Sequence, residues 1–310
     1  MNSYKNITAK TESPPIHETN GISVHGLFEL TKPRLSLLSV FTSSLGFLVY
    51  FPLNYEFSIF FSLTIGTALA AGGAAALNQW MEKEEDSLMP RTANRPIPAR
   101  LVEPELALIF GVCLSSVGLI ILWIGTNPWA CSLTFLTLVV YLLIYTPLKK
   151  RYPYATEVGA ISGALPPLIG WVAASGEPST YGWILFGILF TWQLPHFMAI
   201  AWNFRKDYEK GGFSLQNLGN PNGYHLARKS LIYSFLLTGF VFSPYFIETS
   251  QPTPGLIYFI SACILSTYLL IPSTKFLTSG DRDKSARKLF FVTIIYLPLL
   301  FATLVIDRFI

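Results

Sequence analysis

Long apolar stretches, each close to twenty residues, recur along the chain from residue 36 to the C-terminus. An α-helix of this length crosses the hydrocarbon core of a bilayer, and these stretches lack the polar face of a soluble surface helix. The pattern therefore predicts an all-α, polytopic membrane bundle. We expect about nine transmembrane helices, near residues 36–53, 58–79, 104–125, 128–147, 156–175, 182–202, 231–247, 255–273 and 289–306.

Prolines mark several ends of the expected helices. A proline at a helix start leaves no hydrogen bond unmade, because its missing N–H has no partner there in any case. Four prolines stand at or near such starts: Pro33, Pro104, Pro128 and Pro254. Pro166 and Pro167 instead fall inside the fifth stretch, where they predict a kink or a break.

Composition excludes a soluble fold. Of the 310 residues, 51% are hydrophobic and 13% are charged, and the mean hydropathy is +0.45. Soluble domains carry about 25% charged residues, so this chain has roughly half the usual supply. The three cysteines lie in apolar stretches without CxxC spacing, so we expect neither a disulfide nor a metal site from them.

The basic residues are divided unequally between the two sides of the expected bundle. The N-terminal segment and the loops on its side hold 21 of the 22 Lys and Arg residues, and only Arg308 falls opposite. Such an excess marks the cytoplasmic side. We therefore expect a bacterial cytoplasmic (inner) membrane protein with its N-terminus and its long loops, 80–103 and 203–230, in the cytoplasm. The C-terminus is expected outside.

The first 30 residues form a separate segment. They are polar and lack the apolar core of a signal peptide. We interpret residues 1–30 as a disordered cytoplasmic tail and residues 31–310 as a single transmembrane domain.

A dense cluster of charges follows the second apolar stretch. Asn78, Glu82 and Asp86 are spaced four residues apart, which places their oxygens on one helical face within about 12 Å. Mg²⁺ takes one or two carboxylates and completes its octahedron with water and substrate phosphate. We interpret these residues as magnesium ligands. Glu85 points to the same side, so either Glu82 or Glu85 could hold the middle position.

Two arginines, Arg91 and Arg95, come directly after this cluster. Arginine binds phosphate oxygens through parallel hydrogen bonds. Carboxylates, a divalent cation and arginines together outline a diphosphate site. On composition alone, an ordinary charged loop is the alternative.

Further candidates lie on other helices. Asp207 follows the sixth stretch and is a candidate metal ligand, although the lysines beside it also allow a surface ion pair. Tyr145 and Lys149 are one turn apart at the end of the fourth stretch, where a lysine can neutralise a leaving phosphate or simply mark the cytoplasmic side. His196 lies within an apolar helix, where ionisable residues are commonly functional but can also bond a neighbouring helix.

These residues resemble the UbiA-like intramembrane prenyltransferases, most closely their haem-farnesylating branch, the protohaem IX farnesyltransferases. The string Asn78-x-x-x-Glu82-x-x-x-Asp86 is similar to the metal-binding motif of the family, with Glu82 in place of an aspartate. Seven further motifs match the branch: LTKPR (30–34), RTANRP (91–96), YTPLKK (145–150), GALPPLIGW (163–171), PHF (195–197), KDYEKGG (206–212) and ARKLF (286–290). The loop DYEKGGFSLQN (207–217) departs from the branch and offers one clear acid where other branches show two.

The resemblance implies a bundle around a central cavity open at the cytoplasmic side. It implies transfer of a farnesyl group from farnesyl diphosphate to a vinyl group of haem B, with addition of water, to give haem O and diphosphate. The implied magnesium ligands are Asn78, Glu82, Asp86 and Asp207. The implied diphosphate and substrate contacts are Arg91, Arg95, Lys149, Tyr145, Lys32 and Arg34, with His196 at the haem iron.

The expected partners are farnesyl diphosphate, haem B, the lipid bilayer and a downstream haem-modifying enzyme or terminal oxidase, and no feature indicates nucleic acid. Two alternatives stay open. One is a membrane prenyltransferase acting on an aromatic quinone precursor or another tetrapyrrole. The other is a transporter, which would hold charges near the bilayer midplane, whereas here they gather at one face.

Overall fold

The computed structural model describes residues 23–50, 56–90, 92–149, 152, 154–206, 222–249 and 251–309. Over these residues the chain forms helices and no β-strand, so the predicted all-α class is confirmed. In chain order the helices are α1 (Val24–Leu30), α2 (Pro33–Leu48), α3 (Phe57–Met81), α4 (Lys83–Leu88), α5 (Pro104–Gly125), α6 (Pro128–Val139), the π-helical η1 (Val140–Tyr145), α7 (Thr146–Leu148), α8 (Ala155–Ser175), α9 (Thr180–Asn203), α11 (Tyr224–Phe242), the 3₁₀ turn η2 (Ser243–Tyr245), α12 (Leu256–Thr278) and α13 (Arg282–Ile306).

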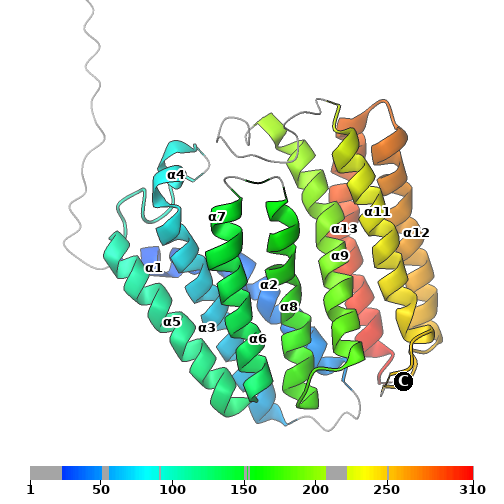
Figure 1. Cartoon of the computed structure of the whole chain (residues 1–310), viewed down its shortest axis with the longest axis horizontal. Helices are drawn as coiled ribbons and strands as arrows, with labels where there is room; N and C mark the ends of the chain where they lie inside the picture. Colours follow the sequence, from blue (N-terminus) through cyan, green and yellow to red (C-terminus); the bar gives the residue numbers. More distant parts are fainter. Residues whose placement is uncertain are drawn as a thin grey trace, which may run out of the picture.

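The long helices stand side by side in one bundle (Figure 1). The short helices α4 and α7 lie at one end of the bundle, and the C-terminus lies at the opposite end. Neighbours in the bundle include α3 with α5, α2 with α8, and α9 with α11 and α13.

Within the described ranges, seven helical segments are long and apolar enough to cross a membrane: α3, α5, the segment Pro128–Leu148, α8, α9, α12 and α13. The first and seventh predicted spans correspond to α2, of 16 residues, and α11, of 19 residues. Both pack into the same bundle. The bundle is therefore confirmed, while the number of nine crossings stays a prediction. Large apolar side chains such as Trp123 and Ile124 lie exposed on its outside, as expected for contact with lipid.

Two helices begin earlier than the apolar pattern indicates. The sequence predicts a start near 289 for the last helix, but α13 begins at Arg282, where the Asp281 side chain accepts a hydrogen bond of 3.0 Å from the Lys284 N–H. This is an N-cap, which starts a helix independently of hydrophobicity. Similarly, α11 begins at Tyr224 rather than 231, directly after Gly223 with a φ of 62°. The last residues of the expected tail form α1, and residues 1–22 lie outside the described residues, so the tail itself stays a prediction.

The sequence predicts a kink or a break at Pro166 and Pro167, but α8 continues as one helix through both prolines, so a break was wrong. Beside it, Gly46 of α2 lies against the carbonyl of Pro167, and Gly170 of α8 lies against the carbonyl of Ser43. A Cβ on either glycine would overlap that carbonyl. Small residues allow helices to approach at backbone distance, and these two glycines hold α2 directly against α8.

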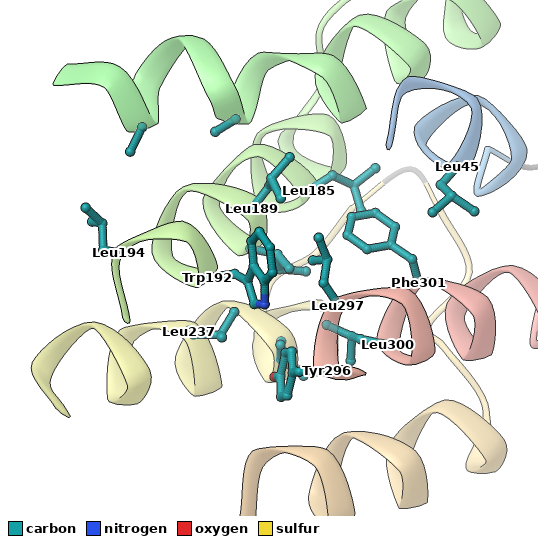
Figure 2. Close-up of a cluster of buried hydrophobic side chains, with 14 of the residues drawn as sticks. Leu45, Leu185, Leu189, Trp192, Leu194, Leu237, Tyr296, Leu297, Leu300 and Phe301 are labelled. Atoms are coloured by element: carbon teal, nitrogen blue, oxygen red, sulfur yellow. The ribbon is translucent and has the colours of Figure 1, made fainter. Parts of the chain in front are cut away.

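A cluster of buried apolar side chains lies where α9 and α13 meet (Figure 2). Leu189 and Trp192 of α9 lie among Leu297 and Phe301 of α13, and all four side chains are buried. The Trp192 indole N–H donates to the backbone carbonyl of Thr293 at 2.8 Å, which satisfies its polar atom inside the core. One face of α9 is thereby fixed on α13, which leaves its opposite face for other contacts.

We expect Gly170→Ala to lower the stability of the bundle by about 1–3 kcal/mol, because the methyl group overfills the α2–α8 contact. Gly239→Ala is the matched control: a Cβ there meets nothing within 4 Å, and alanine is the better helix former. The measurement is the midpoint of thermal unfolding in detergent. Equal midpoints for the two variants would contradict the close contact.

Candidate functional site

A cavity of about 570 Å³ lies between α2, α3, α6, η1, α8 and α9. Charged side chains gather at one end of its lining, contributed by Lys32, Glu82, Asp86, Arg95 and Lys149. Small and apolar residues form much of the rest, among them the alanines at 70, 71, 74 and 75 of α3. The cavity therefore joins a polar compartment to an apolar one.

The acidic residues are placed by the junction of α3 and α4. The helix is interrupted at Glu82, which has φ −107° and ψ 12°. Nevertheless the Glu82 N–H donates to the Asn78 carbonyl at 3.1 Å, and the Asp86 N–H donates to the Glu82 carbonyl at 2.8 Å. The four-residue spacing is kept across the interruption, and Glu82 and Asp86 are only 4% and 1% exposed. Pro90 follows the end of α4 at Leu88.

Each buried carboxylate is paired with a cation from another part of the chain. Asp86 Oδ2 lies 2.5 Å from Arg95 Nη1, and Glu82 pairs with the ammonium of Lys149 after η1. A buried carboxylate is strongly unfavourable unless it is paired and hydrogen-bonded. The two pairs therefore offset the cost of burying two carboxylates in this position.

Lys32 reaches the same cluster from the junction of α1 and α2, and its Nζ donates to Asn78 Oδ1 at 3.3 Å. Its φ of 44° lies in the left-handed region, which non-glycine residues rarely adopt. Backbone strain of this kind, of order 1–3 kcal/mol, clusters at functional sites. Burial lowers the pKa of Lys32 to about 8, and the positive charge of Arg95 acts in the same direction. Three cations facing two carboxylates leave an excess of positive charge suited to an anion.

Aromatic rings line the cavity next to the charges. Tyr145 ends η1, and its ring stacks on that of Tyr141 with centroids 5.8 Å apart. The Lys149 ammonium lies 5.9 Å from the centroid of the Tyr145 ring. Thr146, directly after η1, accepts a hydrogen bond of 3.2 Å from the Asn78 side-chain amide. Single π-helical turns within α-helices recur at functional sites, and this one brings two tyrosines and a lysine together.

The structure assembles most of the predicted site. Six predicted residues line the cavity: Lys32, Glu82, Asp86, Arg95, Tyr145 and Lys149. Asn78 is 3% exposed and stands behind this lining, bonded to Lys32 and Thr146.

Other predicted residues are not part of this cavity lining or lie outside the described residues. Glu82 lines the cavity, whereas Glu85 is half-buried and does not belong to the lining formed by the described residues; which of the two acids is the middle metal ligand stays a prediction. Arg34 is exposed and is also absent from that lining. Arg91 and Asp207 lie outside the described residues, so the roles of Arg34, Arg91 and Asp207 stay predictions.

His196 lies on the face of α9 that is turned towards α13. Its ring stacks with those of Trp192 and Phe290, at centroid distances of 5.2 and 5.1 Å. Nδ1 lies 2.9 Å from Thr293 Oγ1. Its neighbour Phe197 lines the cavity, whereas His196 is not in the lining given by the described part of the chain.

Three further residues of the cavity lining were not predicted: Thr92, Tyr141 and Gln193. Tyr141 stands four residues before Tyr145, and this spacing could have identified it. Gln193 is an amide inside an apolar helix, which is itself a signal. Thr92 donates to the Asp86 carbonyl at 2.9 Å, a contact without a local sequence pattern.

The donor set suits a magnesium ion that is shared with a ligand. No group of three or more His, Cys, Asp or Glu side chains that could hold a metal forms within the described ranges. Glu82 and Asp86 supply two carboxylates, and the Asn78 amide stands beside them. Two carboxylates are what Mg²⁺ typically takes from a protein when phosphate oxygens and water complete its shell.

Comparison with known proteins gives a consistent result. Residues 39–295 match the model of the UbiA prenyltransferase family. A relative from Opitutus terrae named protoheme IX farnesyltransferase is 43% identical over 90% of this chain and 93% of its own length. A mitochondrial protein of that name from Homo sapiens is 35% identical over 88% of this chain and 60% of its own length.

Solved structures share the fold at low sequence identity. A structure described as digeranylgeranylglyceryl phosphate synthase is 14% identical, with a TM-score of 0.79, and the match covers 92% of this chain and 98% of that one. A UbiA homologue from Archaeoglobus fulgidus bound to GPP and Mg²⁺ is 12% identical, with a TM-score of 0.62, and the match covers 90% and 99%.

We expect Glu82→Gln to weaken binding of Mn²⁺, a spectroscopic substitute for Mg²⁺, by about 10- to 100-fold in the presence of inorganic diphosphate. Glu85→Gln is the matched control and should bind Mn²⁺ within about twofold of the unmodified protein, since surface substitutions away from a site have small effects. Electron paramagnetic resonance of free Mn²⁺ measures both. The reverse order of affinities would assign the middle position to Glu85.

Proposed function

Because the chain belongs to the UbiA prenyltransferase family, we propose that it transfers a farnesyl group from farnesyl diphosphate to a vinyl group of protohaem IX (haem B), forming haem O. The observation that carries this proposal is the two-part cavity, in which a cationic end with two acids adjoins an apolar body. The identity of 43% to a protoheme IX farnesyltransferase over most of both chains supports the choice of acceptor.

The charged end has the chemistry to release diphosphate. An allylic diphosphate departs only when the negative charge that develops on its leaving oxygens is neutralised. Arg95, Lys149 and Lys32 provide three positive groups around that position, and we infer that Arg91 contributes a fourth. Mg²⁺, held by Glu82 and Asp86 together with Asn78 and Asp207, supplies further positive charge when bound. Its role is supported by the donor set and by the relative bound to GPP and Mg²⁺.

The aromatic and apolar walls serve the other half of the reaction. The allylic carbon left by diphosphate carries positive charge, and the faces of the Tyr141 and Tyr145 rings can stabilise it. Alanines 70, 71, 74 and 75 leave space for the isoprenoid chain and bring no polar group that could trap the cation. Lys149 and Tyr145, one turn apart, therefore place charge neutralisation and cation stabilisation next to each other.

We infer that His196 is the haem-iron ligand and that its tautomer is fixed for this purpose. The Thr293 hydroxyl donates to the Phe290 carbonyl at 2.7 Å, so it can only accept from His196 Nδ1. The proton is then on Nδ1, and Nε2 carries the lone pair that a metal requires.

We infer a bacterial cytoplasmic membrane with the charged end of the cavity at the cytoplasmic face. This orientation is supported by the 21 of 22 basic residues on one predicted side and by α4 and the C-terminus lying at opposite ends of the bundle (Figure 1). Diphosphate, which is soluble in water, would then be released into the cytoplasm. The haem product, which stays in the bilayer, would pass to a haem-modifying enzyme or a terminal oxidase.

The direct test is incubation of the purified protein with haem B, farnesyl diphosphate and Mg²⁺, followed by mass analysis of the haem. We expect a product heavier than haem B by one farnesyl group and one hydroxyl group, and no product when EDTA removes the metal. Prenylation of a quinone precursor without any change in haem would instead favour the alternative acceptor.

We expect His196→Ala to weaken haem binding by at least about tenfold, because it removes an iron ligand. His225→Ala is the matched control, since His225 lies exposed on α11. Absorption titration of haem in detergent measures the affinity, and the Soret band reports the change of ligand. Unchanged affinity and an unchanged Soret band in His196→Ala would exclude the assignment.

A further inference from the structure

Gln193 is a polar side chain in the apolar body of the cavity. It lines the cavity and is 6% exposed. Its Nε2 donates to the carbonyl of Ala160 at 3.3 Å and to that of Leu189 at 3.2 Å. Because both neighbours can only accept, the atom that faces them must be the nitrogen, and this fixes which way the amide points.

The other end of the amide is left with an unused acceptor. Oε1 accepts no hydrogen bond from any residue in the described ranges, and it lies against Gly163, where a Cβ would overlap it. The glycine thus makes room for this oxygen on the cavity wall. Since it lines the cavity, this acceptor is available to a hydrogen-bond donor that enters it.

Three hydroxyl groups of the cavity lining already donate their hydrogens elsewhere. Ser162 donates to the Gly159 carbonyl at 2.9 Å. Thr134 and Thr137 donate to carbonyls one turn earlier in α6, each at 2.8 Å. An isoprenoid chain and a porphyrin vinyl group have no donor to offer. Water that enters the cavity has an O–H of suitable size for the Gln193 oxygen.

The position of Gln193 matches the point where the reaction needs water. Gly159 of α8 packs against the Tyr145 ring, and Gly163, four residues further along α8, packs against the Gln193 amide. The amide therefore lies one helical turn, about 6 Å, below Tyr145 on the side away from the charged end. In the product, the vinyl carbon that receives oxygen is only two bonds from the farnesyl carbon that leaves diphosphate. We therefore expect this vinyl carbon to lie close to the Gln193 amide.

We propose that Gln193 positions the water molecule that adds to the substrate vinyl group, an inference that rests on the proposed function. The vinyl π electrons form a bond from its terminal carbon to C1 of the farnesyl group, and the C1–O bond breaks with its electron pair on diphosphate. Water, held by a hydrogen bond to Gln193 Oε1, gives a lone pair to the cationic carbon beside the porphyrin ring. It then loses a proton to diphosphate, so one water is consumed and no other reactant is needed.

The proposal predicts a change in product rather than a simple loss of rate. In Gln193→Met, which keeps length and volume, the cation has no positioned water and loses a proton from its neighbouring CH₂ group. The product is then lighter than haem O by one water. We expect the ratio of this dehydrated product to haem O to rise by about tenfold, the factor carried by one lost hydrogen bond. Mass analysis of haem formed in H₂¹⁸O measures the ratio and identifies the source of the hydroxyl oxygen.

Controls separate this inference from the proposed function. Thr191 lies on the same helix outside the described cavity lining, so Thr191→Val should keep the wild-type product ratio. Gln193→Glu retains an acceptor oxygen and should also give the wild-type product ratio. Gln193→Leu serves as a second apolar variant in case the methionine variant does not fold. A wild-type ratio in folded Gln193→Met or Gln193→Leu overturns the proposal, as does loss of all turnover with both substrates still bound. Failure of the wild-type protein to farnesylate haem overturns the proposed function instead.

Discussion

The site depends on the pairing of two buried carboxylates with cations that arrive from separate segments. Glu82 and Asp86 lie at the junction of α3 and α4, Arg95 follows α4 in the chain, and Lys149 comes from the segment after η1. Neither carboxylate is stable alone at an exposure of 4% or 1%, since unpaired buried charge is strongly unfavourable. The two ion pairs therefore connect the α3–α4 junction to the segment after η1 and hold the charged side chains together at one end of the cavity.

The sequence was sufficient for features that repeat along the chain or depend on local spacing. Apolar length predicted the bundle, and the four-residue spacing of Asn78, Glu82 and Asp86 predicted a shared face that persists through an interrupted helix. It could not tell which of Glu82 and Glu85 lines the cavity, because that depends on which acid meets Lys149 from a distant part of the chain. The early start of α13 was missed because a side-chain cap, and not hydrophobicity, begins that helix.

The helix α9 separates two environments within one turn. Trp192 and His196 face α13 and are both bonded to Thr293, through its backbone carbonyl and its hydroxyl respectively. Gln193 and Phe197, one position further along, face the cavity. Because the tryptophan is fixed in the apolar core (Figure 2), the rotation of α9 about its axis is set there. The orientation of the amide in the cavity is consequently determined on the opposite side of the same helix.

The contact of Gly46 and Gly170 with facing carbonyls has a consequence for how such a protein can diversify. The spacing of α2 and α8 is set by main chain against main chain, so it does not depend on which side chains face the cavity. Residues of the lining can therefore be exchanged during evolution while the frame keeps its dimensions. A scaffold of this kind can acquire new acceptors through changes in its lining alone, whereas any enlargement at the two glycines alters the frame itself.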